Sequence, residues 1–120
     1  MSDYELSFAG YAKLYNQTLV LFKKAKKEFN KIKDGSFDEK TFEEIEEELR
    51  YSVCDLSSCH YELSSQYKQF SEEEQILFGK YEILNQSVNR ILMNYQNYKK
   101  IMNDANCVFV VEKEEEISIN

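Results

Sequence analysis

Ser71–Ala105 read SEEEQILFGKYEILNQSVNRILMNYQNYKKIMNDA, and this stretch places an apolar side chain at every third or fourth position. The steps alternate between four and three without a slip, through Leu77, Tyr81, Leu84, Val88, Ile91, Tyr95, Tyr98 and Met102. A straight α-helix drifts by about 20° per heptad relative to such a repeat, so a stripe that keeps it indicates supercoiling around partner helices. Ser71 and Glu74 have the spacing of a capping box, which marks a helix start. The pattern predicts a long helix over 72–105.

Two earlier segments carry the same repeat. The first, over 3–34, contains Tyr4, Phe8, Tyr11, Tyr15, Thr18, Phe22, Ala25, Phe29 and Ile32. It should end at Gly35, because glycine readily takes the left-handed conformation that closes a helix. The second, over 38–69, starts after an N-cap at Ser36 or Asp38 and contains Phe42, Ile45, Leu49, Ser52, Leu56, Cys59, Leu63, Gln66 and Phe70. The sequence therefore predicts three helices of similar length.

The chain has 120 residues, no proline and three glycines, so little in it interrupts long helices. Long helices joined by short links pack as antiparallel neighbours. We therefore predict an all-α fold: an antiparallel three-helix bundle over 1–106 with coiled-coil, spectrin-like packing, followed by a short extended or disordered acidic C-terminal tail over 107–120.

Composition also bears on where the protein works. No apolar run approaches the length of a membrane span, and the N-terminus lacks the pattern of a secretory signal. Three cysteines without paired spacing favour reduced thiols over a disulfide framework. We expect a cytoplasmic protein, or a nuclear one in a eukaryotic host, with no membrane span.

Charge is segregated along the chain. Residues 1–33 hold seven lysines against three acids, and residues 34–75 hold three bases against thirteen acids, within a net charge of −7. The turn at Gly35 should bring Lys23–Lys33 beside Glu39–Glu47, and we expect these opposite charges to be partly paired. A paired lysine cluster in an acidic chain does not favour nucleic acid as a partner.

Residues suited to catalysis are scarce, because the chain has one histidine. A di-iron bundle needs two Glu-x-x-His motifs, which this chain cannot supply. Cys54, Cys59 and His60 form C-x4-C-H, which departs from the C-x-x-C-H of haem attachment and falls within a helical repeat. We expect no enzyme activity, no cofactor, no metal site and no small-molecule substrate.

The outer face of the third helix is rich in amides where a solvated helix usually carries charges, and Asn85, Asn89 and Gln96 represent it. Three aromatic residues, Tyr51, Tyr61 and Phe78, fall off the main stripes, which points to an interface. These features favour a non-catalytic protein–protein interaction module, either a subunit of a larger assembly or a self-associating bundle. The expected partner is another protein or a second copy.

The C-terminal tail offers a second candidate surface, Val108, Phe109, Val110 and Val111, followed by acids. This run resembles a SUMO-interacting motif, which implies addition of a strand to the edge of a partner's sheet in a eukaryotic host. Augmentation of another partner's sheet, a strand packed on the bundle itself and a disordered end all stay open.

The acidic second helix supports an alternative function. Closely spaced carboxylates on a rigid helix can occupy a basic groove, as in acidic inhibitors and immunity-type proteins. Glu43, Glu46 and Glu47 are the candidate residues for such a contact.

Overall fold

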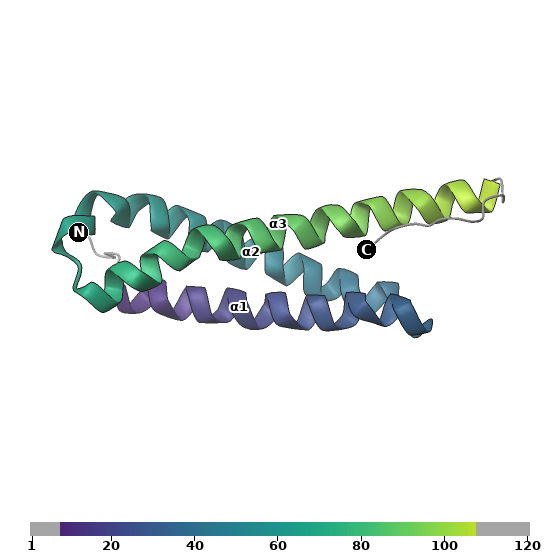
Figure 1. Cartoon of the computed structure of the whole chain (residues 1–120), viewed down its shortest axis with the longest axis horizontal. Coiled ribbons are helices and arrows are strands. Elements are labelled where there is room, and N and C mark those ends of the chain that lie inside the picture. The colour runs from purple at the N-terminus through teal and green to yellow at the C-terminus, as the bar shows by residue number, and fades with distance from the viewer. Residues whose placement is uncertain (1–7, 108–120) are drawn as a thin grey trace. The chain divides into compact units, whose positions relative to one another are not determined.

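The structure of the chain, a computed structural model, describes residues 8–107 (Figure 1). Its elements are α1 (Phe8–Asn30), a 3-10 turn (Lys31–Asp34), α2 (Glu39–Leu63), a second 3-10 segment (Ser64–Gln69) and α3 (Glu72–Cys107). The three helices pack against each other and the described residues contain no strand, which confirms the predicted all-α three-helix bundle. The predicted tail over 107–120, with Val108, Phe109, Val110 and Val111, lies almost wholly outside the described residues.

The chain forms two compact units, Met1–Val88 and Asn89–Asn120, and the boundary between them falls inside α3. The first unit contains α1, α2 and the first half of α3. The second unit contains the rest of α3, in which Ile91, Leu92 and Tyr95 are buried. Within that unit the Tyr95 and Tyr98 rings stack with centroids 6.3 Å apart, and the Lys99 ammonium lies 5.1 Å from the Tyr95 ring centroid.

Seven-residue spacing governs the core of α1 and α2. On α1 the fully buried side chains are Tyr11, Thr18 and Ala25, and on α2 the buried line is Phe42, Leu49, Leu56 and Leu63. All seven lie on the predicted stripes. Supercoiling of these helices as a coiled coil stays a prediction, since burial alone does not establish it.

Small side chains bring α1 and α2 together. Their backbones lie close along much of their length, and Figure 1 shows the two helices running side by side in opposite directions. Thr18 and Ser52 meet at this interface, where their hydroxyl oxygens are 2.6 Å apart in a buried hydrogen bond. The Thr18 hydroxyl also donates to the Leu14 carbonyl at 2.8 Å. Because threonine has a single hydroxyl hydrogen, Ser52 is the donor in the bond between them.

The first half of α3 packs through larger side chains. Phe78, Tyr81, Leu84 and Val88 are buried, yet the α3 backbone approaches neither α1 nor α2 as closely as those two approach each other. Aromatic rings need a larger separation between helix axes than threonine, alanine and serine do. The first unit therefore combines one closely packed helix pair with a third helix held further away by rings.

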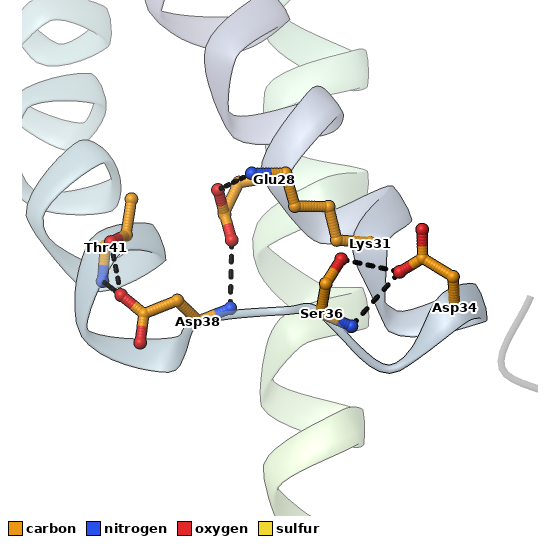
Figure 2. Close-up of polar contacts among 6 residues, drawn as sticks. All are labelled: Glu28, Lys31, Asp34, Ser36, Asp38 and Thr41. Atoms are coloured by element: carbon orange, nitrogen blue, oxygen red, sulfur yellow. Dashed lines mark hydrogen bonds and ion pairs between the residues drawn. The ribbon is translucent and has the colours of Figure 1, made fainter.

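The link between α1 and α2 is fixed by polar contacts (Figure 2). Gly35 has φ +80°, the left-handed conformation predicted for the helix end. Asp38 is the N-cap of α2 and accepts the Thr41 backbone N–H at 3.1 Å, which selects it over Ser36. The buried Glu28 carboxylate accepts the Asp38 backbone N–H at 2.9 Å and ties the last turn of α1 to the start of α2.

The start of α3 carries the predicted capping box. Glu74 donates its backbone N–H to the Ser71 hydroxyl at 3.1 Å, and Ser71 donates its backbone N–H to the Glu74 carboxylate at 2.9 Å. The second helix, expected to run to residue 69, is instead α-helical only to Leu63 and continues as 3-10 helix. The Ser64 hydroxyl donates to the Tyr61 carbonyl at 2.6 Å, and such local bonds compete with the α-helical pattern.

Candidate functional site

The acidic candidates on α2 have different surroundings. Glu43 and Glu47 are exposed. The Glu46 side chain is only 12% exposed and its carboxylate lies 2.8 Å from the Arg50 guanidinium, one turn further along the helix. Glu46 is thus paired with a neighbour on its own helix, so Glu47 is better placed than Glu46 to meet a partner.

The amide candidates lie along α3. Asn85, in the first unit, is half-buried. Asn89 and Gln96, in the second unit, are exposed. Asn89 and Gln96 therefore remain candidates for a partner surface, whereas Asn85 is partly covered by its own chain.

A mixed aromatic and polar cluster joins α1, α2 and α3 at His60. The His60 ring stacks on Phe78 with centroids 3.8 Å apart and on Tyr81 with centroids 4.0 Å apart. Its Nδ1 lies 2.8 Å from the hydroxyl of Tyr11, which is fully buried. The Tyr81 hydroxyl is bonded in turn to the Ser57 hydroxyl at 2.6 Å. We name these five residues the His60 cluster.

Burial determines the protonation states in the His60 cluster. Desolvation lowers the pKa of His60, which the nearby Glu82 carboxylate only partly offsets. Desolvation also raises the pKa of Tyr11 well above its ordinary value. Tyr11 therefore stays a phenol and donates to a neutral His60 near pH 7. The Nδ1 of His60 is hydrogen-bonded, and aromatic side chains cover both faces of its ring. His60 therefore has a structural role, in which it connects α2 to α1 and α3.

The neighbouring thiols are separated. Cys59 is half-buried and Cys54 is exposed. Burial raises the pKa of the Cys59 thiol, and the carboxylates of Asp55 and Glu62 raise it further, so this thiol is a weak nucleophile near neutral pH. Among the described residues, no group of three or more His, Cys, Asp or Glu side chains converges to hold a metal ion.

The off-stripe aromatic residues divide into two kinds. Phe78, taken as a pointer to an interface, is buried against His60 and belongs to the core, so that interpretation was wrong. Tyr51 is 69% exposed and Tyr61 is 80% exposed, both on the solvent side of α2. Two large aromatic rings that the fold leaves in water are candidates for contact with another chain.

The lysines of α1 do not meet the glutamates of α2 as expected. Two ion pairs are local: Lys31 pairs with Glu28 at 3.1 Å, and Arg50 pairs with Glu46. Five lysines, four on α1 and one in the 3-10 turn that follows it, are exposed and make no ion pair with any described residue; they are Lys23, Lys24, Lys26, Lys27 and Lys33. The short turn makes the two helices neighbours, but these side chains point to solvent.

Within residues 8–107, none of the helices combines the length and the apolar character that a membrane span needs. In the comparisons with known proteins, no family model matches this chain, and neither a curated protein nor a solved structure shows significant similarity to it.

Proposed function

We propose that this chain is a non-catalytic protein–protein interaction module, either a subunit of a larger assembly or a self-associating helical bundle. The observation that supports this most is the exposure of Tyr51 and Tyr61 on α2. Tyrosine contributes a large contact area at a low cost in side-chain entropy, and it is enriched among the residues that dominate binding energy. Asn89, Gln96 and the Val108–Val111 run remain further candidates for the same role.

The test is capture of crosslinked partners by the full chain in its native cells, followed by mass spectrometry. The Tyr51→Ser/Tyr61→Ser variant should lose a partner that the wild type retains, while its urea unfolding midpoint stays unchanged. Ile83→Ser is the matched control, because Ile83 is also 69% exposed but lies on α3. Equal capture by all three proteins would remove α2 as the binding surface.

A second candidate, an acidic inhibitor or immunity-type protein, is favoured by the charge around Tyr51. Glu47 and Glu48 are exposed and make no ion pair with any described residue. Binding through these carboxylates should weaken steeply between about 50 and about 300 mM salt, whereas binding through apolar groups should respond little. The Glu43→Gln/Glu46→Gln/Glu47→Gln variant provides the matching test. Unchanged partner binding by that variant would exclude the inhibitor hypothesis.

A further inference from the structure

Two oppositely charged faces lie on the solvent sides of α1 and α2. The α1 lysine face consists of Val20, Lys23, Lys24 and Lys27, and the α2 glutamate face consists of Glu44, Glu47, Glu48 and Tyr51. All eight side chains are exposed. None of the six charged ones makes an ion pair with another described residue. Both faces are therefore charged surfaces that contacts within the described residues leave uncompensated.

The two faces lie at the same level along the helix pair. The Tyr11–His60 hydrogen bond and the Phe29–Phe42 ring contact set the register, because 18 steps forward along α1 match 18 steps back along α2. The Thr18–Ser52 hydrogen bond lies within one residue of this register. In that register Lys23 and Lys24 lie level with Glu48 and Glu47.

The same register extends in both directions from these residues. Lys27 lies level with Glu44, and Val20 lies level with Tyr51. Val20 is 52% exposed and Tyr51 is 69% exposed, so each face places an apolar side chain at one end of its charges. The faces thus match in charge and in the position of their apolar group.

Because no ion pair joins the two faces within one molecule, their matching charges are available to a second molecule. If two copies lie side by side in the same orientation, α1 of one meets α2 of the other without any shift along the axis. Each lysine then faces a glutamate, and Val20 faces Tyr51. We propose that copies of this chain associate laterally, the α1 lysine face of one against the α2 glutamate face of the next.

The proposed contact uses a different face on each copy, so it is heterologous. Each added copy presents a new unoccupied face. The assembly therefore either closes into a ring or continues as an open chain. Exposed ion pairs respond to salt, so the association should weaken by about tenfold or more between about 50 and about 300 mM salt. This inference rests on the self-associating branch of the proposed function and names the partner as a second copy.

The experiment is sedimentation velocity of the full chain over a range of concentrations at low and high salt. Wild type should associate at low salt. Lys23→Glu/Lys24→Glu/Lys27→Glu and Glu44→Lys/Glu47→Lys/Glu48→Lys should each sediment as monomers alone. An equimolar mixture of the two variants should associate, because each acidic α1 then meets a basic α2 and each basic α1 meets an acidic α2. Circular dichroism of each variant checks that the helices are retained.

Two single variants test the apolar end of the faces. Tyr51→Ser should weaken association at every salt concentration. Ile83→Ser is the matched control, because Ile83 is also 69% exposed but lies on α3, outside both faces.

Three outcomes would overturn the proposal: a wild type that stays monomeric at low salt, variants that associate as the wild type does, or a mixture that fails to associate. A monomeric wild type that still captures a different protein from its cells would remove this inference and leave the proposed function standing.

Discussion

Replacing Thr18 with valine tests the polar pair at the centre of the α1–α2 interface. The substitution keeps the shape of the side chain and removes the oxygen that accepts the Ser52 hydroxyl at 2.6 Å. Ser52 is buried, and its other contact, with the Gln17 amide nitrogen, is long at 3.5 Å. A buried hydroxyl that loses its partner costs about 1–3 kcal/mol. We expect Thr18→Val to lower the free energy of unfolding by about that amount.

The reverse substitution should cost less. Ser52→Ala leaves the Thr18 hydroxyl bonded to the Leu14 carbonyl, so only the net value of one hydrogen bond is lost, about 0.5–1.5 kcal/mol. The double variant Thr18→Val/Ser52→Ala leaves neither oxygen in the interface. It should be more stable than Thr18→Val alone, with a coupling energy of about 1 kcal/mol.

Urea unfolding followed by helical circular dichroism measures all three free energies. The control is Thr18→Val/Ser58→Ala, because Ser58 is exposed and the two effects should add. Additive losses in the Thr18→Val/Ser52→Ala variant would refute the reasoning, since they would show that the two hydroxyl groups do not depend on each other.

Three further predictions concern the links and the His60 cluster. Gly35→Ala should destabilise the chain by about 1 kcal/mol, because alanine is strained at φ +80°. Gly79→Ala should stabilise it by about 0.5–1 kcal/mol, because alanine favours the helix more than glycine does. Thermal unfolding compares the two variants, and steric clashes do not contribute because a Cβ at either site meets no atom within 4 Å. Glu28→Ala should lower the free energy of unfolding by about 1–3 kcal/mol, because the Asp38 backbone N–H loses its acceptor. Glu28→Gln keeps an acceptor oxygen and should lower it less. Urea unfolding measures both, and equal losses in the two variants would contradict this role of Glu28. The pKa of His60 is lowered from 6.5, so the folded state binds fewer protons than the unfolded state and stability should fall as the pH drops below about 6.5. Denaturant midpoints measured from pH 8 to 5 should show this decrease. In His60→Gln the midpoints should depend less on pH.

Local chemistry and helical period made much of the fold predictable. The Ser71–Glu74 box and the left-handed Gly35 each depend on a few neighbouring residues. The line of Phe42, Leu49 and Leu56 follows from a seven-residue period that no proline interrupts. These features need no knowledge of how the helices are placed in space.

The rotation of each helix about its axis was less predictable. On α1, Leu21 and Glu28 are buried while Phe22 of the predicted stripe is only half-buried. Leu21 widens the apolar stripe, and a wide stripe allows several rotations between which only contacts with other helices decide. Phe78 was missed for the same reason, because its burial depends on stacking with His60 from α2.

The sequence identified which types of residue form the candidate site, but it did not show in which direction their side chains point. Segment charges correctly predicted that a basic helix adjoins an acidic one, yet they could not show that lysines such as Lys23 and Lys27 point to solvent. Tyr51 and Tyr61 could be found from the sequence, because their positions fall off the buried line of α2. The shared level of the two charged faces required the register, which only contacts between the helices supply.

The Thr18–Ser52 bond therefore has two separable roles. It contributes stability, and together with the Tyr11–His60 bond it fixes the register that holds the α1 lysine face level with the α2 glutamate face. A slip of one residue along α2 would shift each glutamate by about 1.5 Å and turn it by about 100° around the helix, away from the neighbouring copy's lysines. An apolar pair such as valine and alanine fills the same space without specifying one register, because it makes no directional contact. Lateral association should thus be weaker in Thr18→Val/Ser52→Ala than in wild type even where their unfolding free energies are equal, and sedimentation of that double variant at low salt measures the difference.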